Sequence, residues 1–332
     1  MVLSPAIVAL MALGVFSTSP QTIEARTGVD STSSISPAPF MRSGLVYISH
    51  ITLDHASVLD PETNRIIGRI TSGNGTCCVD LLPGVDRGYI ANFNSNDVTV
   101  FDRKTGKTLA TVPAGEHPSH LCLTGDSKCL LISHQSSDGL WFLDTRTDKI
   151  IKKLPEGTGI MCRQDNGKKI YQSQIFIPYV FVIDPETRMI AKKISVGGRP
   201  MDLALTPDQR HLYVPNYDLN ELEVIDTATD SVVARIPHVG GARGIALTRD
   251  GRFAFVTNVV SSTVTVVDLA SAEIAKVIPV GAAPTSVAFR ADGQYAYVSC
   301  QGGASVFVID AHTQEIVRSI VVDSNPIEVQ VR

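Results

Sequence analysis

Short runs of apolar and β-branched residues, separated by polar turns, repeat along almost the whole chain. In one unit the runs begin at Gly244, Phe253, Thr263 and Ala275, and Gly, Asp, Asn or Pro closes each of them. This pattern predicts four β-strands per unit. The runs are nearly continuously apolar, which is typical of sheets that are packed on both faces. No segment shows a sustained helical period, so we expect almost no helix beyond the N-terminus.

An aspartate ends the third strand of each unit and marks the repeat, and successive markers lie 40 or 42 residues apart. The markers are Asp60, Asp102, Asp144, Asp184, Asp226, Asp268 and Asp310. A period in the forties made of strands and turns is typical of a β-propeller. Seven copies predict an all-β, seven-bladed propeller of four-stranded antiparallel blades, with strands a to d running from the hub outward. Because such an Asp accepts nearby backbone N–H groups, we interpret the markers as turn-forming residues.

The two ends of the repeat region predict how the ring closes. Leu45–His50 aligns with strand b, and the chain ends with a segment beginning at Pro326 that aligns with strand a. The C-terminal strand should therefore complete the first blade, which removes two exposed sheet edges. The propeller is expected to span residues 44–332.

The N-terminal segment has the composition of an export signal. Ala6–Phe16 is an apolar run that is too short to span a bilayer, and small residues follow it up to Ala25. This predicts a signal peptide over residues 1–25, although no Lys or Arg precedes the run. Residues 26–43 are rich in Ser, Thr and Pro and should form a disordered linker. The expected location is secreted or periplasmic.

The net charge and the cysteine content limit the kinds of partner and cofactor that we expect. The net charge is −4 and there is no Lys/Arg run, so we expect no nucleic-acid partner, and we expect a monomer with no transmembrane segment. Cys122 and Cys129 flank one a–b turn, so they could form a cross-strand disulfide. The remaining thiols are interpreted as buried apolar side chains. There is no CxxC spacing, and no cofactor is expected.

Several strand-b segments resemble a known repeat. Residues 89–92 (YIAN), 213–216 (YVPN), 255–258 (FVTN) and 297–300 (YVSC) are similar to the Tyr-Val-Thr-Asn motif of the YVTN-family β-propeller proteins. The resemblance covers residues 45–332. It implies the propeller fold and an exported or surface protein, and it says little about activity.

A second, weaker likeness is to the seven-bladed lactonase family, which resembles 6-phosphogluconolactonase. Its repeats often carry Gly-Pro-Arg-His before strand a, and residues 117–120 (HPSH) are similar. His120 stands on that family's histidine position, whereas Ser119 replaces its arginine. The motif occurs in one blade only.

Candidate site residues come from the loops expected at the mouth of the central channel. Strand b ends in Asn in the family motif, but His50 and His134 replace it here. A second set of positions at the start of strand a contains His120, Asp202 and Glu328. The candidate ligand-binding residues are His50, His120, His134, Arg199, Asp202, Arg243 and Glu328.

Three functions fit these residues. The first is a binding module that holds a protein, glycan or small ligand on the loop-rich face. The second is a lactonase-like hydrolase or a lyase that uses His50, His120 and His134 as acid or base groups. The third is a periplasmic metal- or haem-handling protein that uses the same histidines. No complete catalytic motif is present, so the first interpretation is preferred.

Overall fold

The computed structural model describes residue 40 and residues 44–135, 138–157, 161–165 (main chain), 167–237 and 240–331. The expected signal peptide, 1–25, lies outside the described residues, as does the expected linker, 26–43, apart from Phe40. Ile160, one of the strand-a positions, also lies outside them.

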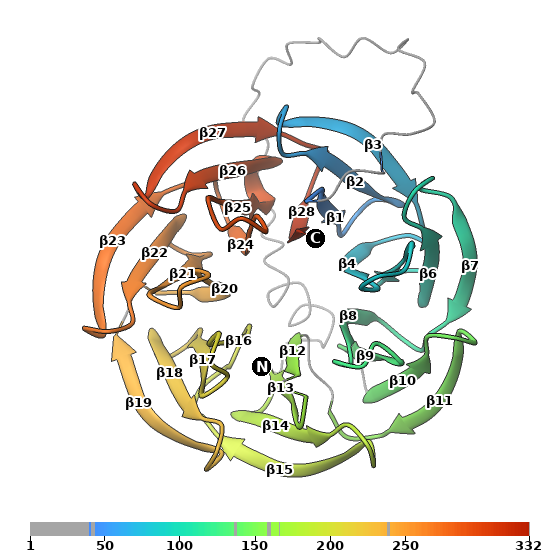
Figure 1. The fold of residues 1–332 in the computed structure, drawn as a ribbon, viewed down its shortest axis with the longest axis horizontal. Coiled ribbons are helices and arrows are strands. Elements are labelled where there is room, and N and C mark those ends of the chain that lie inside the picture. Colours follow the sequence, from blue (N-terminus) through green and yellow to red (C-terminus); the bar gives the residue numbers. More distant parts are fainter. Residues whose placement is uncertain are drawn as a thin grey trace, which may run out of the picture.

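Seven four-stranded antiparallel sheets are arranged as blades around one axis, with the first strand of each blade nearest the centre (Figure 1). The predicted seven-bladed propeller is therefore confirmed. Blade by blade, the strands are β28 (Pro326–Val331), β1 (Val46–His50), β2 (His55–Asp60) and β3 (Arg65–Thr71); β4 (Thr76–Leu81), β5 (Arg87–Asn92), β6 (Asp97–Asp102) and β7 (Thr108–Pro113); β8 (Pro118–Leu123), β9 (Cys129–His134), β10 (Leu140–Asp144) and β11 (Lys149–Leu154); β12 (Met161–Asp165), β13 (Ile170–Gln174), β14 (Tyr179–Asp184) and β15 (Met189–Ser195); β16 (Ala204–Leu205), β17 (His211–Asn216), β18 (Glu221–Asp226) and β19 (Ser231–Pro237); β20 (Ala242–Leu247), β21 (Phe253–Asn258), β22 (Thr263–Asp268) and β23 (Glu273–Pro279); β24 (Pro284–Phe289), β25 (Tyr295–Cys300), β26 (Ser305–Asp310) and β27 (Glu315–Val321).

Helix is almost absent from the described residues, as the sequence predicts for the chain beyond its N-terminus. A three-residue 3-10 turn, Gln301–Gly303, follows β25. Within the described residues, no helix has the length and apolar character needed to cross a bilayer.

The first blade contains both ends of the propeller. Strand β28 pairs antiparallel with β1, so that Val331 lies opposite Val46 and Glu328 opposite Ser49. The predicted closure by the C-terminal strand is confirmed. Glu328 therefore lies on the innermost strand of the first blade, whereas the other strands of that blade come from the N-terminal part of the propeller sequence.

The marker aspartates form the c–d turns. Asp226, for example, ends β18 and accepts the backbone N–H groups of Ala228 at 3.0 Å and Thr229 at 2.8 Å. Equivalent bonds are made by Asp60, Asp102, Asp144, Asp184, Asp268 and Asp310. These N–H groups hold the pKa of Asp226 below its usual range, because they stabilise the carboxylate. The interpretation of the markers as structural residues is confirmed.

The core lies between neighbouring blades. One cluster joins the first and second blades and includes Tyr47, Ile70 and Phe101. Phe40, from the segment expected to be a linker, is 7% exposed and packs into the same cluster, which the sequence did not indicate. Cys122 and Cys129 are buried thiols, so the disulfide that their spacing allowed is not formed.

The closure should carry a large share of the stability. Removing residues 326–332 exposes β1 as an edge and deletes four buried residues, Pro326, Ile327, Val329 and Gln330. We expect the midpoint of thermal unfolding to fall by about 10 °C, measured by circular dichroism. A synthetic peptide with the sequence of residues 326–332 should restore part of the loss, whereas a scrambled peptide should not. An unchanged midpoint after the deletion would show that the closing strand is dispensable.

Candidate functional site

A cavity of about 420 Å³ lies among the innermost strands of the ring. Its walls come from β16, β20, β24 and β28, with His120 contributed by β8. His120, Asp202 and Glu328 lie at the end where strand a begins. Apolar side chains such as Ile245 and Val287 line the wall, and Arg249, in the a–b turn of its blade, lies toward the other end. The cavity therefore has one acidic and histidine-containing end and a largely apolar body.

Three side chains from three consecutive blades meet at that polar end. Cys78 is on β4, His120 on β8 and Glu328 on β28, and their sulfur, ring-nitrogen and carboxylate atoms lie within 4.8 Å of one another. Cys78 and His120 are buried and Glu328 is partly buried. We call this group the channel cluster.

The channel cluster occupies a recurring position with a structural role. Cys78, His120 and Glu328 are each the third residue of their strand, so these strands begin two residues earlier than the sequence predicted. In three blades the side chain at this position accepts a backbone N–H from the next blade. The observed pairs are Leu121 to the Cys78 sulfur at 3.4 Å, Ile245 to Asp202 at 3.3 Å and Val329 to Ser286 at 3.4 Å. These bonds join adjacent innermost strands, a role that sequence reasoning missed.

Asp202 is held mainly by the backbone. One carboxylate oxygen accepts the N–H of Leu203 at 2.8 Å, and the other accepts that of Ile245. Its own N–H donates to the carbonyl of Arg243 at 3.1 Å. Both oxygens of Asp202 are thus engaged by backbone N–H groups.

Arg243 is buried behind the same end of the cavity. It is 4% exposed and interacts electrostatically with Cys77, Asp202 and Glu328. Burial lowers the pKa of its guanidinium to about 10, so the group still carries a positive charge at neutral pH. The structure thus brings four of the predicted residues together: His120, Asp202, Arg243 and Glu328.

His50 and His134 lie elsewhere. The ring nitrogens of His50 contact the Ser324 carbonyl oxygen at 3.1 Å and the Ser57 hydroxyl at 2.9 Å. Those of His134 face the carbonyl oxygens of Gly139 and Ala114. Among the residues that the structure describes, no group of possible metal ligands combines two of the three candidate histidines.

The residue that ends strand b bonds within its own blade. Asn92 donates to the hydroxyl of Thr99 at 2.8 Å, and Asn258 donates to that of Thr265 at 2.8 Å. Both partners lie seven residues later on strand c, as Ser57 does for His50. His50 therefore takes over the structural contact that the family asparagine makes.

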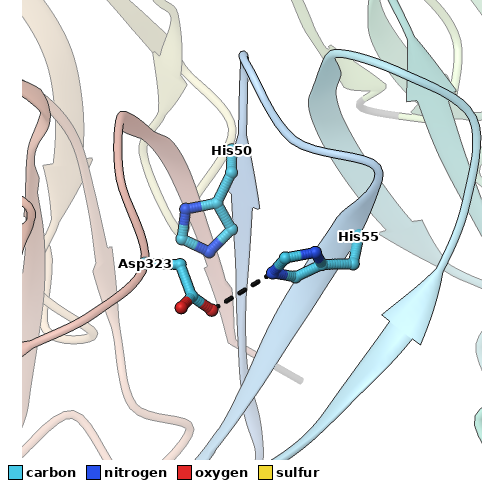
Figure 2. Close-up of side chains that lie close together, drawn as sticks. All are labelled: His50, His55 and Asp323. Atoms are coloured by element: carbon cyan, nitrogen blue, oxygen red, sulfur yellow. Dashed lines mark hydrogen bonds and ion pairs between the residues drawn. The ribbon is translucent and has the colours of Figure 1, made fainter.

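His50 belongs to a second cluster, which we call the seam cluster, with His55 and Asp323 (Figure 2). His55 contacts Asp323 at 3.1 Å, and Arg69 donates to both carboxylate oxygens at 2.8 and 2.9 Å. Ser57 also donates to Asp323, at 2.9 Å. These contacts, led by the Arg69 hydrogen bond, hold the pKa of Asp323 well below its usual range. The seam cluster binds the loop before β28 to β2 and β3.

Arg199 has a partly exposed side chain. Its guanidinium donates to Asp218 at 2.9 Å and lies 4.4 Å from the centre of the Tyr217 ring. This side chain is therefore engaged in an ion pair and a cation–π contact away from the channel cluster.

Comparisons with known proteins agree with the fold. A family model described as YNCE-like β-propeller matches residues 185–291. Antigen Lp49 of Leptospira interrogans is 30% identical over 135 residues, which is 38% of this chain and 30% of the antigen. The match therefore spans less than a third of that relative's length.

Solved structures share the whole ring. A chain of Kuenenia stuttgartiensis hydrazine synthase superposes with a TM-score of 0.72 at 17% identity, covering 86% of this chain and 99% of that one. A protein of unknown function from Desulfotomaculum acetoxidans gives 0.75 at 14% identity, covering 87% and 99%. At these identities the likeness shows the fold alone. The family model covers only part of this chain, and together with the fold it supports the resemblance to YVTN-like β-propeller repeat proteins.

The buried His50 should make the fold sensitive to mild acid. Burial lowers its pKa to about 4 from an ordinary value of 6.5, so below pH 6.5 the unfolded chain takes up a proton that the folded chain does not. Stability should fall by up to about 3 kcal/mol as the pH drops from 6.5 to 4. His50→Asn, which restores the family residue opposite Ser57, should remove this part of the pH dependence.

The measurement is urea unfolding at several pH values between 7 and 4 on wild type and on His50→Asn. His312→Asn, at an exposed turn, is the matched control and should follow wild type. Parallel pH profiles for wild type and His50→Asn would contradict the assignment of the buried neutral imidazole.

Proposed function

We propose that this YVTN-like propeller is an exported binding module whose central cavity holds a small hydroxylated ligand. The observation that carries the proposal is that His120 and Glu328 both line a cavity of about 420 Å³, with the buried Arg243 close enough to Glu328 to interact with it electrostatically. Ligand pockets are commonly about 300–1,000 Å³, mostly apolar, with a few polar groups that fix orientation. This cavity has both properties.

The charges favour a ligand rich in hydroxyl groups. The Glu328 carboxylate accepts hydrogen bonds, while a His120 ring N–H can donate one, and both side chains line the cavity. A hydroxyl group uses both kinds of partner at once, so a compact polyol or sugar suits this end. The apolar wall at Ile245 and Val287 would contact the carbon skeleton.

Two observations support export. The N-terminal segment has the composition of a signal peptide, and the partly matching Leptospira protein is named as an antigen. Placement outside the cell or in the periplasm would give the open end of the propeller access to ligands from the environment.

The test is a thermal-shift screen of the purified chain against monosaccharides and polyols, with simple amines and amino acids as comparison panels. A ligand at 100 times its Kd should stabilise the fold by about 2.7 kcal/mol and raise the unfolding midpoint by about 5–10 °C. Glu328→Gln and His120→Gln should each weaken binding at least tenfold, because each changes a polar contact at the wall of the cavity.

Glu186→Gln, on an exposed turn, makes the same chemical change far from the cavity and should bind as wild type does. A hit that binds Glu328→Gln as tightly as wild type would place its site elsewhere. A screen in which only amines or amino acids bind would overturn the assignment of a hydroxylated ligand.

A further inference from the structure

We propose that the channel cluster, Cys78, His120 and Glu328, binds one Zn²⁺ ion at the polar end of the central cavity. This inference deepens the proposed function by adding a metal ion to the same site. It rests on the proposed function only for the molecule that would bind from the cavity, since that molecule and the ion would share His120 and Glu328. The metal site itself follows from the geometry of three side chains.

The spacing of the donor atoms suits a single ion. The Cys78 sulfur, a His120 ring nitrogen and a Glu328 oxygen lie within 4.8 Å of one another. Tetrahedral zinc, with bonds of about 2.0–2.3 Å, separates its ligand atoms by about 3.3–3.8 Å. The group would therefore have to contract by at most about 1.5 Å, which side-chain rotation can supply.

The donor types favour zinc. One thiolate, one imidazole and one carboxylate form the mixed sulfur, nitrogen and oxygen set that Zn²⁺ accepts, whereas Mg²⁺ and Ca²⁺ prefer oxygen alone. Three protein ligands leave a fourth position open. His120 and Glu328 both line the cavity, so that position would face the cavity and could receive a ligand hydroxyl or water.

The surrounding backbone is arranged to hold these ligands. The Leu121 N–H group donates to the Cys78 sulfur at 3.4 Å, and Leu121 directly follows His120. Residues 120 and 121 thus supply both the imidazole ligand and the N–H group that orients the Cys78 sulfur. Glu328 is fixed by the pairing of β28 with β1. Such supporting hydrogen bonds orient metal ligands and stabilise a thiolate.

Charge balance also favours a divalent cation. A Cys78 thiolate and the Glu328 carboxylate would place two negative charges in a largely buried position, and Zn²⁺ neutralises both. Arg243 is the nearby cation, and its charge also faces Asp202. Binding would release the thiol proton of Cys78, so affinity should fall as the pH is lowered.

The seam cluster is a poorer candidate for the ion. Both oxygens of Asp323 already accept hydrogen bonds from the Arg69 guanidinium, and Ser57 and His55 contact the same carboxylate. Both ring nitrogens of His50 also have partners. A metal there would have to displace the Arg69 guanidinium from both oxygens of Asp323.

The test uses Zn²⁺ and Co²⁺ as probes on the intact chain after treatment with a chelator. Zn²⁺ should bind with a stoichiometry of one per chain by isothermal titration calorimetry and should raise the unfolding midpoint. Co²⁺ should give a near-ultraviolet thiolate-to-metal charge-transfer band. Cys78→Ser should abolish the band and weaken Zn²⁺ binding at least 100-fold, and His120→Gln should weaken it at least tenfold.

Cys300→Ser and His134→Gln change the same residue types at other buried positions and should bind Zn²⁺ as wild type does. Circular dichroism checks that each variant folds, and the wild-type Co²⁺ spectrum tests sulfur ligation even if a variant does not. Absence of the charge-transfer band in wild type, or its persistence in Cys78→Ser, overturns the proposal. Loss of the band in Cys77→Ser but not in Cys78→Ser also overturns it.

The outcome is separable from that of the proposed function. If the chelator-treated chain binds a polyol but not Zn²⁺, the metal site is wrong and the binding module stands. If it binds Zn²⁺ through Cys78 but no hydroxylated compound in either form, the metal site stands and the proposed ligand class is wrong.

Discussion

The backbone pairing between β28 and β1 is the contact on which the rest of the structure depends. It joins the last strand of the chain to the first and converts a row of similar blades into a ring. Without it, both strands would be exposed edges with unpaired N–H and C=O groups. It also supplies Glu328 to the centre. The channel cluster therefore exists only in the closed ring, because Cys78 and His120 lie in the next two blades.

Much of the polar character of this propeller has a structural explanation that repeats from blade to blade. Asparagine or histidine at the end of strand b bonds within its own blade, as Asn92 does with Thr99 and His50 does with Ser57. In three blades a side chain near the start of strand a accepts an N–H from the next blade. A candidate functional residue is therefore easiest to recognise where a side chain in one of these structural positions also has distinctive chemistry, as the Cys78 thiol does.

The sequence was sufficient for the fold because each blade repeats the same turn chemistry. Asp226 and its equivalents end strand c at nearly equal intervals, and that period determines the number of blades and the position of the closing strand. For the same reason, the alignment of repeats could place Glu328, His120 and Asp202 at equivalent positions in their blades. Alignment of the repeats shows in which blade a residue lies and how far along its strand it stands, and this was enough to find these members of the site.

Alignment could not show which way each side chain points. His50 and His134 occupy equivalent positions, yet their rings turn toward nearby backbone and hydroxyl oxygens of local loops rather than toward His120. Cys78 occupies the position in its blade that His120 occupies in the next blade, but it was interpreted as a buried apolar thiol. Its contact with Leu121 depends on the distance between the blades, which an alignment of repeats does not give. Phe40 lies in a segment whose composition predicts disorder, and only the groove between two blades explains its burial.

Hydrogen–deuterium exchange of the backbone amides tests the central claim, that the closed ring assembles the channel cluster, most directly. The account predicts that the β28 amides exchange as slowly as those of β1 and of the other innermost strands, and that they open in the same cooperative step. Fast exchange in β28, as in a frayed chain end, would contradict it. Glu328 would then not be held beside Cys78 and His120.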